Sequence, residues 1–375
     1  MTEHYDVAVI GLGVMGAATL SALARQGVHA IGLDRFAPPH AHGSSHGQTR
    51  MVRVAYAESP VYAPMARRAI DLWRELEQRT GTALLTQSGV LYGGPPEGAF
   101  MQGVHTAAQR HNIPLMDAPK GSILRHGMRL PDDWPAVLES DGGFVLAEEA
   151  VQAFLLDAMA HRALVRNDNP SAPPRRNARG FVLETNGAPV HAENIIVTAG
   201  PWTAHILPAL APLLRLQRRV LHWFDDPKGK MSKTSNFHPF GIETAQNGFL
   251  YGFPALDKTG VKIAEHIIDD PLASVDALQP NGTATDMAHI DPLVQTHLPL
   301  VGARKTMAAC IYTMSPDEHF IIDEAPGQSG IYVGAGFSGH GFKFAPLIGE
   351  ALAALAMGQD CDFPTAFFAL GRFAT

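Results

Sequence analysis

The hydrophobic pattern at the amino end predicts a strand, a helix and a second strand. Residues 6–10, DVAVI, form a short apolar run rich in β-branched residues, as expected of a buried strand. Residues 17–27, AATLSALARQG, have the composition of a helix that ends near Gly27. The next apolar run, VHAIGLD, predicts a strand that ends at Asp34. This alternation indicates an α/β fold with parallel strands.

The turn between the first strand and the helix carries three glycines in the spacing GxGxxG. Gly11 permits a tight turn, Gly13 lets the backbone approach a pyrophosphate, and Gly16 allows close contact between helix and strand. The helix amino terminus offers N–H groups and the positive end of its dipole to phosphates. Asp34 lies at the distance expected of an acid that binds ribose hydroxyls. The unit therefore predicts a dinucleotide site, without separating NAD from FAD.

A second GxGxxG occurs near the carboxyl end, in IYVGAGFSGHG. It comprises Gly334, Gly336 and Gly339. A second complete nucleotide fold would need another strand that ends in an acid about 20 residues later. Here the apolar stretch 343–358 follows instead, with the composition of a helix. We therefore predict a strand and glycine turn that lead into a helix, whose amino terminus faces a ligand and can stabilise negative charge.

A third apolar segment, ENIIVTAGPWTAHIL at 193–207, predicts a buried strand that runs into a helix. Together with the two glycine segments it suggests one nucleotide-binding domain assembled from separated pieces. We assign residues 1–83, 143–208 and 315–375 to this domain. Residues 84–142 and 209–314 would then form a second domain, which covers the cofactor and binds substrate.

Composition excludes several classes of partner. The chain has 375 residues, a net charge of -7 and no apolar run of about 18 residues, so we expect neither a nucleic-acid partner nor a membrane span. The basic stretches 174–179 and 215–219 are interpreted as solvated surface. The amino end lacks the features of a signal peptide, and the only cysteines are Cys310 and Cys361. These features fit a reducing cytoplasm.

The sequence HAHGSSH contains three closely spaced histidines, His40, His42 and His46, that could be taken for metal ligands. No carboxylate or cysteine lies nearby, and the intervening Gly-Ser-Ser suits a loop near a phosphate or flavin. We therefore expect no metal site.

Three further segments carry a family resemblance. They are HGSSHGQTRMVRVAYAE at 42–58, YGFPALDKTGVKIAEH at 251–266, and CIYTMSPDEHFIID at 310–323, which is followed by GAGFSGHGFKF. The chain resembles the monomeric sarcosine oxidase and N-methyltryptophan oxidase family of flavoproteins, within the DAO-like superfamily, from the first strand to the last helix. The resemblance implies a p-hydroxybenzoate-hydroxylase-like fold, in which a Rossmann-type FAD-binding domain is interleaved with a mixed-sheet substrate domain. It also implies a monomer that oxidises a secondary (N-methyl) amino acid to an imine and reduces oxygen to hydrogen peroxide.

The resemblance also implies residues that bind the cofactor. Taken alone, Cys310 could be a buried, inert cysteine. By resemblance it carries FAD through a thioether, with His46 as a supporting residue beside the flavin; such attachment needs a depressed thiol pKa or a nearby cation. The full set of expected cofactor-binding residues is Gly11, Gly13, Gly16, Asp34, Ser44, His46, Thr49, Cys310, Gly339, Gly341 and Lys343.

Other matching residues would act on substrate and oxygen. By resemblance Arg50 approaches the flavin, Arg53 and Lys343 hold the substrate carboxylate, and Lys262 activates oxygen. His266, Tyr251 and Tyr312 would line the substrate cavity. From the residues alone the arginines could be a solvated pair, Lys262 could face solvent, and the tyrosines could be core. Arg50 and Arg53 share one side only if their segment is helical, and diverge if it is extended.

The exact substrate stays open at this stage. Gln48 replaces an acid common in the family's HGxTR motif, and Glu265 occupies a variable position; either could change the charge of the cavity. Alternatives are an FAD-dependent oxidase or dehydrogenase of another amine (pipecolate, a proline-like substrate or a D-amino acid), an NAD-dependent dehydrogenase, and a non-catalytic flavin-binding module. An NAD enzyme would leave the Cys310 segment and the second glycine motif unexplained.

Overall fold

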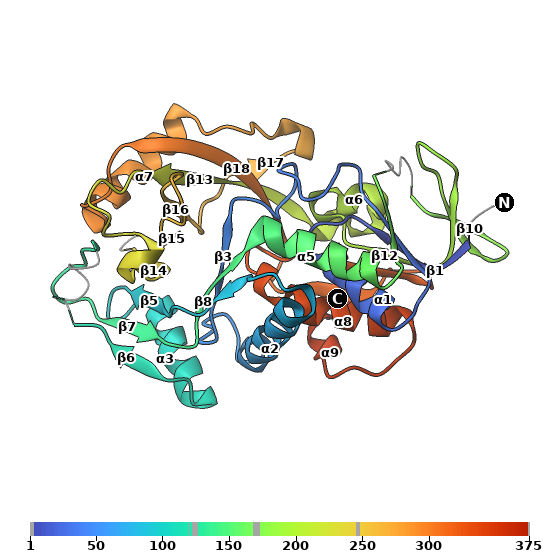
Figure 1. The fold of residues 1–375 in the computed structure, drawn as a ribbon, viewed down its shortest axis with the longest axis horizontal. Helices are drawn as coiled ribbons and strands as arrows, with labels where there is room; N and C mark the ends of the chain where they lie inside the picture. Colours follow the sequence, from blue (N-terminus) through green and yellow to red (C-terminus); the bar gives the residue numbers. More distant parts are fainter. Residues whose placement is uncertain (1–3, 120, 122–126, 168–172, 245–247, 374–375) are drawn as a thin grey trace.

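The computed structural model describes residues 4–119, 121, 127–167, 173–244 and 248–373. Its strands form two large sheets toward opposite ends of an elongated molecule, and a small third sheet lies between them (Figure 1). The fold is of the mixed α/β class, as the alternating elements of the sequence predict.

The first sheet contains the expected dinucleotide-binding unit. Strand β1 (His4–Ile10) pairs in parallel with β2 (Ala30–Leu33) on one side and β12 (Val190–Val197) on the other. β12 also pairs in parallel with β20 (Ile331–Ala335), so the three segments singled out in the sequence meet in one sheet. The sheet is completed by β9 (Leu164–Arg166), β10 (Arg175–Asn177), β11 (Gly180–Leu183) and β19 (Ile321–Glu324).

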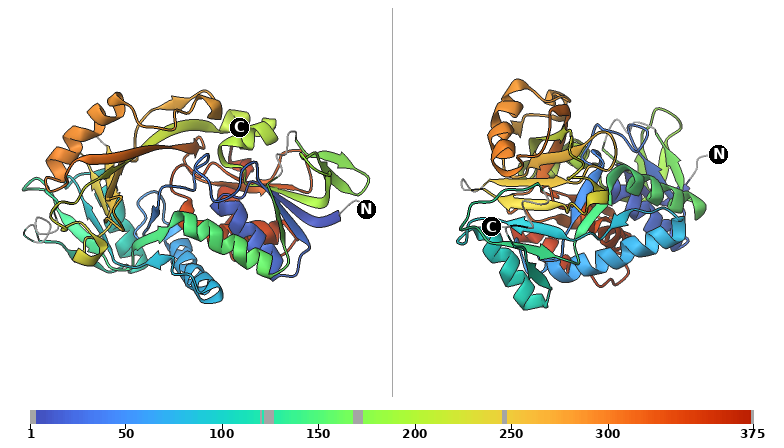
Figure 2. Two further views of the ribbon diagram at one scale, coloured as in Figure 1. Left: turned by 45° about the horizontal axis from the view of Figure 1, so that its top comes forward. Right: turned by 60° about the vertical axis from the view of Figure 1, so that its left-hand side comes forward.

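A layer of helices covers this sheet. Helix α1 (Val14–Arg25) contacts both α5 (Ala147–Ala160) and α8 (Ala345–Ala356), and nearly all of its residues are buried. Its small apolar residues suit it to this position, because a helix surrounded by other elements needs no polar face. Helix α2 (Tyr62–Thr80) is amphipathic and ends at Gly81, whose left-handed backbone (φ 68°) is the conformation that glycine favours at a helix end. Figure 2 shows α1, α5 and α8 grouped beside the first sheet.

The second sheet is mixed and carries much of the smaller cavity described below. Its order is β17 (Pro271–Leu272), β13 (Arg215–Phe224), β16 (Val261–Glu265), β15 (Phe249–Phe253), β14 (Phe240–Glu243), β5 (Val90–Gly93), β7 (Ala136–Glu139) and β6 (Leu115–Asp117), while β18 (Arg304–Met314) pairs with β13. β13 pairs antiparallel with both β16 and β18, and its register places Trp223 opposite Lys262 and Arg219 opposite Cys310. The segments that carry Lys262 and Cys310 are thereby both held beside β13.

The third sheet consists of β3 (Thr49–Val52), β8 (Gly143–Leu146) and β4 (Leu85–Thr86). β3 carries Arg50 and leads directly to Arg53, so this segment is extended and not helical. The remaining α-helices of the described residues are α3 (Ala99–His111), α6 (Thr203–Ile206), α7 (Ala284–His297) and α9 (Thr365–Phe368).

The basic stretch 215–219 is partly buried, which contradicts its interpretation as solvated surface. Arg218 is buried and donates hydrogen bonds to Asp286 at 2.7 and 2.9 Å, while Arg219 is buried beside His266. Both lie on β13, where three neighbouring strands exclude water. A buried guanidinium persists only with such partners.

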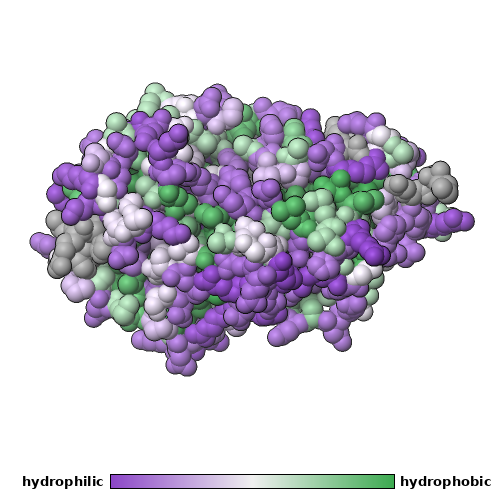
Figure 3. All heavy atoms as spheres, in the orientation of Figure 1, coloured by the Kyte–Doolittle hydropathy of each residue, from purple (hydrophilic) through white to green (hydrophobic). Residues whose placement is uncertain are grey.

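Hydrophilic residues cover most of the face shown in Figure 3, and hydrophobic residues gather in patches near its middle. Among the described residues, no helix is both long and apolar enough to span a membrane. The same residues contain no cluster of metal-ligating side chains, and His40 pairs instead with Asp34 at 3.3 Å. The division into two domains stays a prediction, although the first sheet is built from segments assigned to one domain and the second sheet from segments assigned to the other.

Candidate active site

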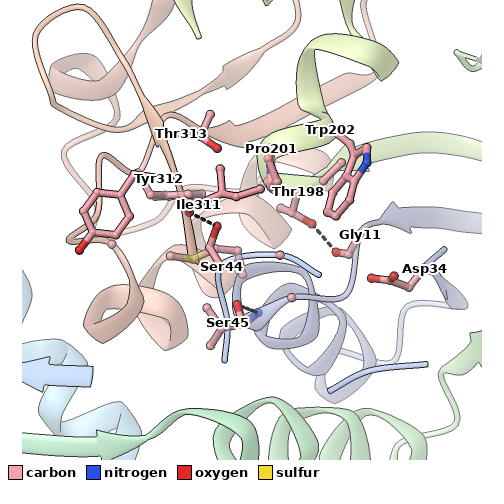
Figure 4. A pocket seen from close by; sticks show the side chains of 18 of the residues that line it. Gly11, Asp34, Ser44, Ser45, Thr198, Pro201, Trp202, Ile311, Tyr312 and Thr313 are labelled. Atoms are coloured by element: carbon pink, nitrogen blue, oxygen red, sulfur yellow. Dashed lines mark hydrogen bonds between the residues drawn. The ribbon is translucent and has the colours of Figure 1, made fainter. Parts of the chain in front are cut away.

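A long cavity of about 440 Å³ begins at the amino-terminal glycine turn and reaches β18. Figure 4 shows Gly11 and Asp34 toward one end of it and Tyr312 toward the other, with Ser44 between them. Six of the expected cofactor residues line this cavity: Gly11, Gly13, Asp34, Ser44, Gly339 and Gly341. At its far end the cavity is lined by Ile311, the neighbour of Cys310 in the chain, and not by Cys310 itself. Gly16 does not line the cavity; it packs against the backbone of Gly11.

The glycine turn has no room for side chains. A Cβ atom on Gly11 would lie 2.7 Å from Ala199 Cα, and one on Gly16 would lie 1.8 Å from the Gly11 carbonyl oxygen. Gly13 instead faces the cavity, and its nearest neighbour would be Ser45 Oγ at 3.2 Å. Helix α1 begins here without an acidic residue in its first turn. The turn therefore leaves the helix amino terminus open to an anionic group.

Asp34 stands at the end of β2 and closes this end of the cavity. Its carboxylate accepts hydrogen bonds from the backbone N–H of Leu12 at 2.6 Å and of Phe36 at 2.9 Å. These bonds fix the carboxylate beside the glycine turn, where the sequence places a ribose ligand. Its role as that ligand stays a prediction.

The far end of the long cavity has an unsatisfied polar group. Thr313 Oγ1 lies in the wall of the cavity and has no hydrogen-bond partner among the described parts of the chain. The buried His46 Nε2 and Thr49 Oγ1 are unpaired among the same residues, but His46 and Thr49 line neither cavity. Buried polar groups are normally paired, so the Thr313 hydroxyl indicates a missing polar partner. Together with the glycine turn, it fits a bound dinucleotide that spans the cavity.

A smaller cavity, of about 80 Å³, adjoins the first. Arg50, Tyr312, Gly339 and Phe342 line both cavities. The smaller cavity is also lined by Met51, Arg53, Leu221, Phe249, Tyr251, Phe253, His266, Cys310, His340 and Lys343. The structure therefore brings Arg53, Lys343, His266 and Tyr251, which come from four separate segments, to one place beside the cofactor cavity.

Arg53 and Lys343 are the two buried cations of this cavity. Arg53 stacks over the Tyr56 ring at 4.1 Å and forms an ion pair with Glu58. Burial lowers the pKa of Arg53, but the Glu58 carboxylate more than offsets this, and Arg53 in turn holds the pKa of Glu58 at about 2 against the opposing effect of burial. Burial, aided by the nearby Arg53, lowers the pKa of Lys343 well below its ordinary value. An anion between these cations would favour both charges.

Lys262 is 2% exposed, so the expectation that it could simply face solvent is wrong. It lies on β16, where every residue is buried, because the strand is covered on both faces. Its ammonium donates hydrogen bonds to the carbonyl oxygens of Gly47 at 2.8 Å and Thr49 at 2.6 Å, and lies 4.3 Å from the Phe253 ring centroid. Burial and the neighbouring Arg50 lower the pKa of Lys262 well below its ordinary value.

Arg50 and Arg53 diverge, as an extended segment requires. Arg50 donates hydrogen bonds to the carbonyl oxygens of Thr49 at 2.8 Å and Ser44 at 2.7 Å, and it lies over the Phe342 ring at the boundary of the two cavities. Gly339, with φ 79°, passes so close to Tyr312 that a Cβ atom would lie 2.1 Å from the ring. Only glycine permits so close an approach of the backbone to the ring.

The aromatic side of the smaller cavity contains a hydrogen-bonded pair. His266 Nδ1 lies 3.2 Å from the Tyr312 hydroxyl, and Arg219 stacks over the Tyr312 ring at 4.8 Å. Burial, reinforced by Arg219, lowers the pKa of His266 to about 4, so this histidine is neutral at physiological pH. Arg219 was missed in the sequence because it was assigned to a solvated stretch.

Sequence analysis also missed three residues of the site, Tyr56, Glu58 and His340. They reach the site only through long-range contacts, and their sole sequence signal is that they adjoin Arg53 and Lys343. Gln48 and Glu265 were expected to influence the cavity, but neither lines it. Gln48 accepts a hydrogen bond from Trp223 at 2.7 Å, and Glu265 pairs with His289 at 2.6 Å.

A glycine-turn dinucleotide site joined to a small cationic cavity defines a nucleotide-dependent oxidoreductase. Residues 6–355 match the family described as FAD dependent oxidoreductase, DAO. The chain belongs to this family, and its cofactor is therefore FAD.

Full-length relatives support this assignment. The chain is 35% identical to a monomeric sarcosine oxidase of Bacillus sp. (strain NS-129), over 100% of this chain and 98% of the relative. It is 34% identical to an N-methyl-L-tryptophan oxidase of Salmonella heidelberg (strain SL476), over 99% of each. Among solved structures, NikD, an amino acid oxidase of nikkomycin biosynthesis, has a TM-score of 0.86 at 22% identity over 98% of each chain. Glycine oxidase from Geobacillus kaustophilus has a TM-score of 0.81 at 21% identity over 99% of each chain. The fold is thus that of the DAO-type flavoprotein oxidases.

Proposed function

We propose that this protein oxidises the C–N bond of a small secondary amino acid such as sarcosine, and reduces oxygen to hydrogen peroxide. The observation that carries the proposal is the placement of Arg53 and Lys343 in one small cavity that shares Arg50 and Tyr312 with the cofactor cavity. Two buried cations in a cavity that adjoins the cofactor cavity match a substrate with one carboxylate. The names of the relatives support an N-methyl amino acid.

The guanidinium of Arg53 can donate hydrogen bonds to a substrate carboxylate and keep its ion pair with Glu58. It carries five N–H donors, of which Nη2 faces Glu58 and Nη1 makes only a long 3.4 Å contact with the Ala55 carbonyl. Lys343 supplies the second cation. With the carboxylate held at this end, the substrate amine reaches toward Tyr312 and the boundary of the cofactor cavity.

The remaining residues set the conditions for amine oxidation. His266 is neutral and hydrogen-bonded to Tyr312. The cations Arg53 and Lys343 in the same cavity disfavour a further positive charge, so the substrate amine can bind unprotonated. FAD, when bound, would supply the redox chemistry of amine oxidation, while the protein would position the substrate and set the local charge.

Burial opposes a charge on Lys262, but the carbonyl oxygens of Gly47 and Thr49 accept hydrogen bonds from its Nζ and favour the ammonium form. This ammonium would stabilise developing superoxide without proton transfer.

The small cavity volume favours a compact substrate. About 80 Å³ between Phe249, Tyr251 and Phe253 suits a sarcosine-sized molecule better than one with an indole ring. The test is oxygen consumption and peroxide formation by the purified holoenzyme with sarcosine, N-methyl-L-tryptophan, L-proline, pipecolate and D-alanine. We expect equimolar peroxide and the highest kcat/KM with sarcosine or another small N-methyl amino acid. Activity confined to cyclic or D-amino acids would replace the substrate assignment, and oxidation without oxygen uptake would identify a dehydrogenase.

We also propose that FAD is attached covalently through Cys310. Burial would raise the pKa of this thiol, but the neighbouring His46 side chain and the positive charge of Arg50 lower it to about 7. A large fraction is therefore thiolate at neutral pH, and the thiolate is the nucleophile. It would form a C–S bond to a flavin methyl carbon as that carbon loses a proton; the two electrons would pass to the flavin ring, which oxygen would then reoxidise to give hydrogen peroxide.

Acid precipitation tests this attachment. The yellow colour of the wild-type protein should stay with the precipitate, whereas the Cys310→Ser protein should release its flavin into the supernatant. Cys361→Ser is the matched control, since Cys361 lies outside both cavities, and it should behave as wild type. Release of flavin from the wild-type protein would remove Cys310 as the attachment site and leave the oxidase proposal standing.

A further inference from the structure

A chain of three hydrogen-bonded, buried side chains begins at Lys343 in the wall of the smaller cavity. The Lys343 ammonium donates to the Tyr56 hydroxyl at 3.1 Å and to the His340 carbonyl oxygen at 2.7 Å. The Tyr56 hydroxyl lies 2.7 Å from His340 Nδ1, and His340 Nε2 lies 3.0 Å from the Glu318 carbonyl oxygen. Lys343, Tyr56 and His340 are 5%, 1% and 8% exposed. The chain is therefore shielded from water along its length.

The chemistry of these groups allows one direction of donation when Lys343 is charged. An ammonium can only donate, so the Tyr56 oxygen accepts from Lys343. The single Tyr56 proton then goes to His340 Nδ1, the nearer of its two acceptors. His340 consequently carries its proton on Nε2 and donates it to the Glu318 carbonyl. Each hydrogen bond of the chain then joins one donor to one acceptor.

The opposite direction leaves a conflict. If Lys343 were a neutral amine that accepted from Tyr56, then His340 Nδ1 would have to donate to Tyr56. A neutral ring would then present an unprotonated Nε2 to the Glu318 carbonyl, and two acceptors would face each other. A charged ring would avoid this conflict, but burial lowers the pKa of His340 to about 3. The network thus fixes Lys343 as the donor to two oxygen acceptors, and hydrogen bonds donated to such acceptors favour the ammonium over the neutral amine.

We propose that Tyr56 and His340 are positioning residues that hold the Lys343 side chain charged and aim its one remaining N–H donor at the substrate carboxylate. The inference rests on the proposed function, which makes Lys343 a carboxylate ligand. Lys343 lines the smaller cavity, and two of its three donors are occupied by the chain and the His340 carbonyl. The third is the one available to a ligand.

Tyr56 has a second contact that the test must keep. Its ring stacks beneath the Arg53 guanidinium at 4.1 Å and packs against Tyr62 at 4.7 Å. Tyr56→Phe preserves both ring contacts and removes only the hydroxyl. Tyr62→Phe is the matched control, because Tyr62 is equally buried but its hydroxyl bonds His319, at 3.0 Å, and not Lys343.

The experiment measures carboxylate binding by the holoenzyme, both in turnover and by titration with acetate followed through the visible flavin band. In Tyr56→Phe we expect KM for the amino acid and Kd for acetate to rise about tenfold, as expected for the loss of one hydrogen bond to a charged group. We expect kcat to change less than threefold and Tyr62→Phe to match wild type. His340→Asn, which keeps an acceptor near the Nδ1 position, should weaken acetate binding less than His340→Leu does.

Several outcomes would overturn the proposal. Unchanged acetate affinity in Tyr56→Phe, at wild-type flavin content and melting temperature, would show that the hydroxyl does not position Lys343. Equal losses in Tyr56→Phe and Tyr62→Phe would reduce the effect to packing. The acetate titration needs no turnover, so it decides the role of the chain even if the protein oxidises none of the amino acids tested. In that case the proposed function fails, while the role of Tyr56 and His340 is still decided by the titration.

Discussion

Replacing Lys262 by methionine is expected to slow the reaction of reduced flavin with oxygen by about 100-fold or more, the usual effect of removing one preorganised electrostatic group. Flavin reduction by substrate should change less than threefold. The reason is that Lys262 is a buried cation on β16 whose electrostatic neighbours include Arg50 and Cys310, residues of the smaller cavity, while it does not line the cavity where the substrate binds. Stopped-flow absorbance of the two half-reactions measures each rate separately.

The exposed Lys258 provides the control for this substitution. It lies just before the same strand, so Lys258→Met removes a like charge without touching the Gly47–Thr49 carbonyls. We expect both half-reactions to match wild type in that variant. Equal slowing of reduction and reoxidation in Lys262→Met would show that Lys262 supports the site as a whole and does not act on oxygen.

Replacing Arg53 by glutamine is expected to lower kcat/KM by about 100-fold or more. Removal of one partner from a buried, hydrogen-bonded charge pair typically costs about 2–5 kcal/mol. Here the loss includes the bond to a substrate carboxylate, and steady-state kinetics with sarcosine measures it. Arg53→Lys should recover only part of the activity, because an ammonium cannot present the paired donors of a guanidinium.

Glu58→Gln separates substrate binding from the internal ion pair. If Arg53 acts on the substrate, releasing it from Glu58 should leave KM unchanged or lower it. A fall in kcat/KM in Glu58→Gln as large as that in Arg53→Gln would mean that the ion pair itself, and not a bond to the substrate, accounts for the importance of Arg53.

The cofactor half of the site could be predicted from sequence because its determinants are local. The glycine spacing, the helix composition and Asp34 fall within one strand–helix–strand unit, and the structure places Gly11 and Asp34 on one cavity as expected. The second glycine motif was likewise interpreted correctly as a turn between β20 and a helix, with a short 3-10 helix (Phe342–Phe344) before α8.

The substrate half depends on contacts that no local pattern encodes. Lys262 alternates with apolar residues, as a solvent-facing residue would, and only the position of β16 inside a mixed sheet buries it. The charged residues around Arg219 are typical of a surface stretch, and only the pairing of β13 with β18 explains why Arg219 is buried. Tyr56 meets Lys343 and His340 across more than 280 residues of chain. The family resemblance named the key cations, but not the residues that hold them.

The central claim is that a carboxylate-bearing secondary amine binds at Arg53 and Lys343 and gives up its electrons to FAD. Anaerobic mixing of the purified yellow holoenzyme with sarcosine tests it most directly, with the visible flavin band as the readout. The account predicts that sarcosine bleaches the band and that admitting air restores it, while the neutral amide of sarcosine bleaches it far more slowly. A flavin band that stays unchanged with every N-methyl amino acid, or bleaches equally with acid and amide, would contradict the account.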